Sequence, residues 1–354
     1  MVFVKHTTGV RVGMVGYGMS GSVFHAPLLG SAPRLQLAAV VTSRREKLAQ
    51  DLPGVRGVDT IEELLRDPEI DLVVVASPTS LHFEHAQAAL NSGKHVVVDK
   101  PFTVTVREAD QLIEMAAVRM RVLSIFQNRR WDNDFRTVRH CISQGWLGRV
   151  YEYEAHYDRF RPAIKPGWRE EGLPGSGLLY DLGAHLIDQA LVLFGMPEAV
   201  TADVFAQRTN AQMPDYFHLT LHYGRSRAIL HAANLVREPG PHFAVHGDGG
   251  SFLKYGMDSQ EEALKAGQRP GSSGWGSDPL AMHGVLVSAD GVRRVVETLP
   301  GSYESFYQGI AASILDGAPA PVAATDARDG IRVIEACVQS ARSERTISLE
   351  AQPG

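Results

Sequence analysis

The chain has 354 residues, of which 44% are apolar and 21% are charged, and its formal net charge at pH 7 is −5. This length allows two domains with buried cores, and the lack of a long block of one charge argues against a nucleic-acid groove or a basic membrane patch. The first residues lack the order of a signal peptide, and no apolar run approaches the ~20 residues needed to cross a bilayer. We expect a cytoplasmic protein that binds neither nucleic acid nor membrane. Its two cysteines, Cys141 and Cys337, are expected to be small buried residues rather than a disulfide.

Short apolar runs alternate with helical patterns over the first third of the chain. Runs of this kind, bounded by turn residues, are typical of strands buried on both faces of a sheet. The alternation predicts an α/β fold with a doubly wound parallel sheet, that is, an N-terminal Rossmann domain. The predicted strands are Val10–Val15, Leu35–Val41, Leu72–Ala76, His95–Val98 and Val122–Phe126. The predicted helices are Arg45–Gln50, Ile61–Arg66, Phe83–Asn91 and Val106–Arg119.

The pattern then changes, so we place a dinucleotide-binding domain at 1–127 and a substrate-binding and oligomerisation domain at 128–354. Several alternating runs separated by tight turns predict a C-terminal α+β domain with a large, open, mostly antiparallel sheet. Its predicted strands are Arg149–Phe160, Ala199–Ala206, Tyr216–Tyr223, Arg227–Asn234, His242–Val245 and Ser251–Tyr255. Its predicted helices are Trp131–Gln144, Asp181–Phe194, Tyr303–Leu315 and Thr325–Ser343, the last of which could pack back on the first domain.

A glycine-rich loop of the form Gly-x-Gly-x-x-Gly follows the first predicted strand. Glycines permit a tight turn and let the backbone approach a pyrophosphate at the N-terminus of the next helix. The motif alone could be a plain tight turn, but a strand before it and an α/β alternation after it favour dinucleotide binding. The residues expected at the cofactor are Gly16, Tyr17, Gly18, Met19, Ser20 and Gly21.

The end of the second predicted strand bears on which dinucleotide is bound. An NAD site usually has an acidic residue here for the ribose hydroxyls, whereas this chain continues Thr42-Ser43-Arg44-Arg45. Ser43 and Arg44 could hold a 2′-phosphate without a carboxylate to repel it, so we favour NADP over NAD. The alternative is that both arginines are solvated loop residues.

The loop after the strand Leu72–Ala76 is expected at the carboxyl edge of the sheet, where ligands bind in such folds. Backbone groups of Ser77 and Pro78 and the Thr79 side chain could contact the nicotinamide half of the cofactor. His82 could be a cofactor contact or a surface residue at a helix start, and the sequence leaves both open.

Three polar residues suggest proton transfer. Asp181 and His185 are four residues apart and would share one helical face, a spacing that also suits a structural pair. Lys100 favours the catalytic interpretation. It follows a buried strand at the carboxyl edge of the first sheet, where the cofactor is expected. Since partly burying an ammonium group is costly, a lysine at this place needs a functional reason.

At this point the chain resembles the glucose–fructose oxidoreductase, inositol dehydrogenase and rhizopine-catabolism family (Gfo/Idh/MocA). The resemblance covers nearly the whole chain and includes the glycine loop, Asp99-Lys100-Pro101 and the segment Asp181–Asp188. The family's Glu-Lys-Pro stands here as Asp-Lys-Pro, which keeps the lysine. Phe24–Pro27 and Phe126–Asp132 resemble the branch that holds an NADP-dependent scyllo-inositol dehydrogenase.

The resemblance implies roles at the matching positions. Lys100 would bind the reacting hydroxyl beside the cofactor, His185 would be the general acid/base, and Asp181 would orient the substrate and tune His185. The resemblance also implies that Trp168-Arg169 close over the cofactor. From their places at predicted strand ends, Asn128, Asp158 and Arg159 could line the substrate pocket. The remaining residues expected at the cofactor are Asp99, Lys100, Pro101 and Asn128.

These observations predict an NADP-dependent dehydrogenase or reductase that acts on a secondary alcohol of a cyclic polyol or sugar. Two alternatives stay open: a reductase of a non-sugar C=O, C=C or C=N substrate, and a non-catalytic sensor of nicotinamide dinucleotides. No metal site is expected, because His218 and His222 belong to one face of a strand with apolar neighbours. The exposed face of the second sheet is expected to form a homodimer or homotetramer.

Overall fold

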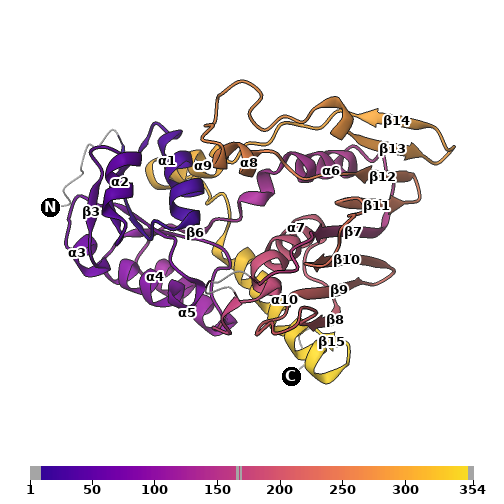
Figure 1. The fold of residues 1–354 in the computed structure, drawn as a ribbon, viewed down its shortest axis with the longest axis horizontal. Helices are drawn as coiled ribbons and strands as arrows, with labels where there is room; N and C mark the ends of the chain where they lie inside the picture. The colour runs from indigo at the N-terminus through magenta and orange to yellow at the C-terminus, as the bar shows by residue number, and fades with distance from the viewer. Residues whose placement is uncertain (1–8, 165–166, 168–169, 350–354) are drawn as a thin grey trace.

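The computed structural model describes residues 9–164, 167 and 170–349. In these ranges the chain forms two sheets, each with its own helices, and the N-terminal sheet and the C-terminal sheet lie on opposite sides of the molecule (Figure 1). Within the described ranges, no helix is long and apolar enough to cross a membrane.

The first sheet consists of the parallel strands β1 (Val10–Val15), β2 (Leu35–Val41), β3 (Arg56–Val58), β4 (Leu72–Val75), β5 (His95–Val98) and β6 (Leu123–Ile125). Their order is β3-β2-β1-β4-β5-β6, so the direction of winding reverses between β1 and β4. Ligands bind outside the carboxyl ends of the strands at such a switch point. All four residues of β4 are 0% exposed, because helices cover both faces of the sheet. These helices include α1 (Ala26–Gly30), α2 (Arg45–Asp51), α3 (Ile61–Leu65), α4 (His82–Asn91) and α5 (Val106–Val118).

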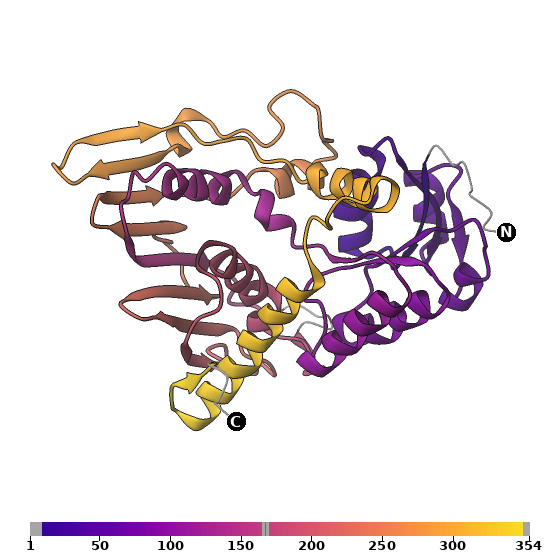
Figure 2. The same cartoon turned by 180° about the vertical axis from the view of Figure 1, so that it is seen from behind.

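The second sheet has nine strands in the order β14-β13-β12-β11-β7-β10-β9-β8-β15. The strands are β7 (Val150–Asp158), β8 (Ala199–Phe205), β9 (Tyr216–Tyr223), β10 (Ser226–Ala233), β11 (Phe243–Gly247), β12 (Gly250–Lys254), β13 (Gly284–Ser288), β14 (Arg293–Val296) and β15 (Ile347–Ser348). Neighbouring strands are antiparallel except for β7 and β10, which are parallel. The helices α6 (Asn133–Ser143), α7 (Ala184–Phe194) and α10 (Ala324–Ser343) lie on the face turned toward the first domain, and the opposite face is open (Figures 1 and 2).

The C-terminal helices connect the two sheets. Helix α9 (Glu304–Asp316) packs on α1 and β1 of the first domain, and α10 packs on α5 as well as on α7 and β8. Ser124 in β6 donates a hydrogen bond to the Val322 carbonyl at 2.7 Å, just before α10 begins. The last third of the chain therefore holds the Rossmann domain and the second sheet together.

The predicted fold class is confirmed, with differences at the level of single elements. Strands β3, β13, β14 and β15 were not predicted, and the short helix α8 (Gln260–Lys265) lies in the segment between β12 and β13. Two helices begin with a π-helical turn: Ser20–His25 precedes α1, and Leu179–Gly183 precedes α7. Both turns carry predicted site residues, and π-helical turns are frequent at functional sites.

Candidate active site

The glycine loop leaves β1 in a conformation that only glycine adopts easily. Gly16 has φ +104°, and a Cβ there would lie 2.6 Å from the Ala76 carbonyl oxygen. Gly21 packs directly on the Gly16 carbonyl, so it too has no room for a side chain. At Gly18, by contrast, no described atom lies within 4 Å of an added Cβ, so this backbone faces open space. The loop therefore fits a pyrophosphate, which needs close approach to bare backbone ahead of a helix.

The other predicted residues of this loop have different surroundings. Tyr17 is 3% exposed and donates a hydrogen bond to Asp51 Oδ2 at 3.0 Å, which ties the loop to α2. Met19 is 53% exposed beside the loop. Ser20 donates a hydrogen bond to Asp99 Oδ2 at 2.5 Å, so the loop is also tied to the segment that carries Lys100.

The two adjacent arginines after β2, Arg44 and Arg45, have different surroundings. Arg45 forms an ion pair with Asp59 at 2.7 Å and donates a hydrogen bond to the Gly57 carbonyl. Ser43 and Arg44 are exposed, and the Arg44 guanidinium makes no hydrogen bond or ion pair with any residue that the structure describes. The Arg44 backbone is held by a hydrogen bond of its N–H to Thr42 Oγ1 at 2.9 Å. The backbone of Arg44 is thus held in place, while its side chain, within the described part of the chain, remains able to contact a ligand.

The loop after β4 is linked to the loop after β5 by His82. Its ring nitrogens lie 2.8 Å from the Pro101 carbonyl and 3.0 Å from the Ser77 carbonyl, and the residue is 1% exposed. The expectation of a possible surface residue was therefore wrong. Burial lowers the pKa of His82, and a neutral ring donates to one carbonyl at a time. The Thr79 hydroxyl is buried without a hydrogen-bond partner among the described residues, and it lines the pocket that holds Lys100.

Asp99 joins three segments that sequence reasoning treated separately. Its Oδ2 accepts the Ser20 hydrogen bond and lies 3.8 Å from His25 Nε2, and its Oδ1 accepts the Lys100 backbone N–H at 2.8 Å. His25 Nδ1 in turn lies 2.6 Å from the Tyr307 hydroxyl. Burial alone would raise the pKa of Asp99, but the interactions with His25 and Ser20 lower it below the ordinary carboxylate range. Asp99 is thus an anion that fixes the backbone on which Lys100 stands.

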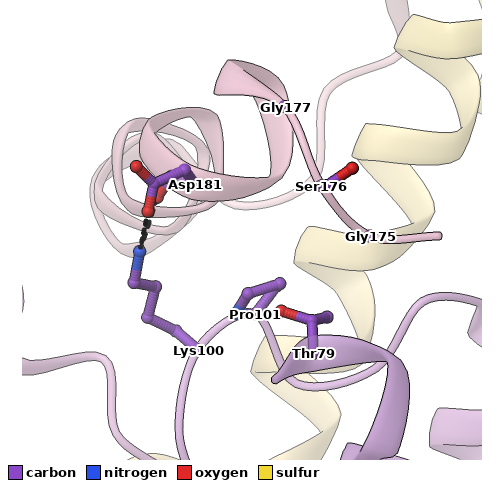
Figure 3. Close-up of a pocket in the computed structure, with 7 residues that line it drawn as sticks. All are labelled: Thr79, Lys100, Pro101, Gly175, Ser176, Gly177 and Asp181. Atoms are coloured by element: carbon purple, nitrogen blue, oxygen red, sulfur yellow. Dashed lines mark hydrogen bonds and ion pairs between the residues drawn. The ribbon is translucent and has the colours of Figure 1, made fainter. Parts of the chain in front are cut away.

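Lys100 and Asp181 meet across the gap between the two domains. Lys100 Nζ donates hydrogen bonds to Asp181 Oδ1 at 2.9 Å and to the Asp181 backbone oxygen at 2.7 Å. Figure 3 shows the two side chains facing each other, with Pro101 and Thr79 to the right of Lys100. An ammonium group has three donors, so one remains for a ligand. The lining residues of this small pocket are Thr79, Lys100, Pro101, Gly175, Ser176, Gly177 and Asp181.

His185 lies one turn beyond Asp181, at the start of α7, and is 4% exposed. Its Nδ1 is buried without a hydrogen-bond partner in the described part of the chain. Burial, followed by the positive charges of Lys100 and Arg129, lowers the pKa of His185 well below 6.5, while Asp181 acts in the opposite direction. The ring is therefore neutral at physiological pH and has a lone pair that can accept a proton.

The remaining predicted site residues do not all lie near the Lys100–Asp181 pair. Asn128 is 5% exposed and begins the 3₁₀ turn Asn128–Trp131 directly after β6. Arg159 donates a hydrogen bond to Asn234 at 2.7 Å and interacts electrostatically with Asp181. Asp158, expected in the substrate pocket, lies instead with His156 and His231 on the open face of the second sheet, because neighbouring strand residues point to opposite faces. Trp168 and Arg169 lie outside the described residues.

Sequence reasoning missed the residues that complete the pocket wall. Gly175, Ser176 and Gly177 come from the Pro- and Gly-rich loop, and φ is +76° at Gly175 and +86° at Gly177. A Cβ on Gly175 would lie 2.7 Å from Thr79 Cγ2, so the glycine lets this loop touch the first domain. The only available signal was the glycine content of the loop, which does not identify a partner.

Comparisons with known proteins agree with this geometry. A model described as an oxidoreductase family with an NAD-binding Rossmann fold matches residues 10–127, and its C-terminal alpha/beta domain matches 139–349. The scyllo-inositol 2-dehydrogenase (NADP(+)) IolW of Bacillus subtilis is 46% identical over 96% of both chains. The uncharacterized oxidoreductase YdgJ of Escherichia coli is 45% identical over 96% of this chain and 99% of its own. Among solved structures, the oxidoreductase yvaA of Bacillus subtilis superposes with a TM-score of 0.95 at 45% identity, covering 98% of this chain and 100% of that chain.

Proposed function

Because the chain belongs to the Gfo/Idh/MocA family of NAD(P)-binding oxidoreductases, we propose that it interconverts a secondary alcohol and a ketone of a cyclic polyol, with NADP as its cofactor. The observation that carries the proposal is the meeting of a lysine–carboxylate pair with a neutral, buried histidine at the carboxyl edge of the Rossmann sheet. Lys100, Asp181 and His185 supply charge stabilisation and a base at one place, as oxidation of an alcohol requires.

The cofactor would be held by the glycine loop, by the end of β2 and by the loops that contain Thr79 and Lys100. Gly18 offers open backbone for the pyrophosphate, and Arg44, whose guanidinium has no partner in the described ranges, would bind a 2′-phosphate. The NADP-dependent relative supports this choice of dinucleotide. When bound, the nicotinamide accepts or returns the hydride of the reaction.

The protein residues would accept the proton and stabilise the charge that develops on the substrate oxygen. The third donor of Lys100 would bind the substrate oxygen and stabilise the negative charge that develops as the O–H proton leaves. The proton would pass to the neutral imidazole of His185. Asp181 would hold Lys100 in place through its side-chain and backbone oxygens.

We further propose that a second copy of the chain covers the open face of the large sheet. Over strands β11 to β14 this face carries a row of apolar residues in register: Ala244, Leu253, Val285 and Val295. Val295 is 61% exposed, and Leu253 and Val285 are half-buried in the single chain. A continuous apolar row on a sheet face is typical of an interface between subunits.

The proposed activity is tested by measuring NADP⁺ reduction with scyllo-inositol, other inositols and cyclic sugars, and NADPH oxidation with non-sugar carbonyl, C=C and C=N compounds. We expect turnover with at least one cyclic polyol and faster turnover with NADP⁺ than with NAD⁺. Turnover confined to the second group would replace the proposed substrate class. Tight cofactor binding without turnover on any compound would indicate a sensor instead.

A further inference from the structure

A cluster of histidines and carboxylates lies on the open face of the second sheet, away from the proposed active site. His156 on β7 stands directly opposite His231 on β10, and His231 stands opposite His218 on β9. Asp158 lies two residues beyond His156 and therefore on the same face. The alternate residues Tyr153, Ala155 and Tyr157 are buried on the helix-covered face, which separates the cluster from α7.

The donor atoms of three of these residues converge on one point. Asp158 Oδ2 lies 3.4 Å from His156 Nδ1, and Asp158 Oδ1 lies 3.2 Å from His231 Nε2. One donor atom from each residue falls within 4.8 Å of the other two. A tetrahedral ion with bonds of about 2.0–2.1 Å separates its ligands by roughly 3.3 Å. The two distances to Asp158 are close to this value but involve its two different oxygens, so with one donor atom from each residue, all within 4.8 Å, a small adjustment of the side chains would bring the three onto one ion.

Asp158 is a buried carboxylate that its surroundings do not fully satisfy. Its side chain is 8% exposed, and Oδ1 makes no hydrogen bond of acceptable geometry within the described residues despite the nearness of His231. A buried anion of this kind requires a cation or further donors.

Glu154 provides the outer support that metal-binding histidines usually have. Its Oε2 lies 3.2 Å from His156 Nε2, on the side of the ring that faces away from Asp158. This contact favours the tautomer with the proton on Nε2 and leaves the Nδ1 lone pair toward the cluster. Carboxylate–histidine–metal arrangements fix ligand orientation in this way.

We propose that His156, Asp158 and His231 bind a divalent transition-metal ion of the Zn²⁺ class, with water in the fourth position. Two imidazoles and one carboxylate form a donor set that suits Zn²⁺ and not the all-oxygen preference of Ca²⁺ or Mg²⁺. The ion would join β7 to β10, the parallel pair of this sheet, and would be structural because it lies apart from Lys100 and His185. These ligands could not be recognised from the sequence, because His231 is 73 residues from Asp158 in the chain and the two come together only through strand pairing.

The test uses the full chain without an affinity tag, treated with a chelator and then titrated with Zn²⁺ in competition with a chromophoric chelator. We expect one Zn²⁺ per chain. His231→Ala and Asp158→Asn should each weaken binding by more than about 100-fold, since even loss of an outer partner costs about 10–100-fold. Glu154→Gln should weaken it by about tenfold. Circular dichroism establishes that each variant is folded.

The matched control is His222→Ala. His222 belongs to the same sheet, on β9, but its Nε2 is engaged by Thr201 Oγ1 at 2.9 Å and it lies outside the cluster. This variant should bind Zn²⁺ as the wild type does, and Co²⁺ in its place should give the visible absorption of a tetrahedral site. Absence of stoichiometric Zn²⁺ binding, or equal binding by the wild type and both Asp158→Asn and His231→Ala, would overturn the proposal and leave a hydrogen-bonded histidine–carboxylate cluster.

Discussion

Two adjacent arginines at the end of β2 differ in their surroundings, and the proposed cofactor choice depends on one of them. Arg45 is engaged by Asp59 and the Gly57 carbonyl, whereas the Arg44 side chain has no partner in the ranges that the structure describes. Arg44→Ala should therefore weaken NADPH binding by about 1.5–3 kcal/mol, the loss expected for a hydrogen bond to a charged group, and leave NADH binding nearly unchanged. Calorimetric titration of both cofactors measures this.

Arg45→Ala is the matched control for this prediction. It removes the same charge one residue away, but from a side chain that is already paired, so the preference for NADPH should be largely kept. Equal affinities of the wild type for NADPH and NADH would contradict the assignment of Ser43 and Arg44 to a 2′-phosphate.

The second prediction at this scale concerns His185. His185→Ala should lower kcat by roughly 10²–10⁴-fold, the range for a positioned acid or base, and should barely change cofactor affinity because the glycine loop is intact. Since the pKa of His185 is lowered well below 6.5, the acid limb of kcat/KM for alcohol oxidation should lie below pH 6.5 in the wild type. A variant that keeps the wild-type rate and the same limb would show that another residue moves the proton.

The charges of Asp181 and Lys100 shift the pKa of His185 in opposite directions, and this difference can be tested. Asp181 raises the pKa of His185, so Asp181→Asn should move the acid limb to lower pH. Lys100 lowers it, so Lys100→Met should move the limb to higher pH, with a lower kcat and some loss of cofactor affinity. Shifts in the same direction for both variants would be inconsistent with a histidine base between these charges.

At the scale of elements, the Rossmann sheet carries a pH-sensitive connection between β5 and β6. His95 Nδ1 accepts the Val122 backbone N–H at 2.9 Å, which requires an unprotonated nitrogen. Burial, followed by the charge of Arg121, lowers the pKa of His95 to about 4. The unfolded chain, with a pKa near 6.5, then binds more protons between these values, so this contribution to stability is complete above pH 6.5 and declines as the pH falls toward 4.

The corresponding variant is His95→Asn, whose amide oxygen can still accept from Val122. Other buried histidines also lose stability in acid, so the informative quantity is the difference between the two proteins. On lowering the pH from 7 to 5, the free energy of unfolding of the wild type should fall by on the order of 1–2 kcal/mol more than that of the variant. Urea denaturation at both pH values measures it, and equal losses would contradict the role of His95.

The elements that could be predicted from the sequence are those whose residues show a periodicity of their own. Strand β4 is apolar throughout, and β5 is apolar after His95, because both faces of these strands are buried. Strand β9 alternates because only one of its faces is buried. Strands β3, β14 and β15 are short or exposed edge strands, and their identity depends on pairing with distant segments. The π-helical start of α7 was also invisible, because apolar spacing does not distinguish it from an α-helical turn.

The same distinction applies to the site. Gly16, Lys100 and Asp181 could be found because each stands at a motif or at a strand end. The link from Tyr307 through His25 to Asp99 could not, because it joins residues 282 and 74 positions apart, with no local pattern. The face of the sheet that carries Asp158 was predicted wrongly for a related reason. Alternation along β7 shows that adjacent residues point to opposite faces of the sheet, but it does not show which face the helices cover.

At the scale of the whole molecule, the proposed active site takes residues from both domains. Lys100 comes from the Rossmann sheet, Asp181 from the second domain, and α9 and α10 fix the two bodies by packing on both. One face of the large sheet is covered by α6, α7 and α10, and the opposite face is open (Figure 2).

The last prediction tests that second face. Val285→Asp places a carboxylate in the centre of the apolar row formed with Leu253 and Val295. In the single chain Val285 is only half-buried, so the fold should persist, but in an assembly the charge would be desolvated without a partner, which is strongly unfavourable. Sedimentation velocity should show a dimer or tetramer for the wild type and a smaller species for the variant.

Val292→Asp is the matched control, because Val292 is 59% exposed in the turn between β13 and β14 and lies outside the row. A monomeric wild type, or a Val285→Asp protein of unchanged mass, would mean that the apolar row is not a subunit interface.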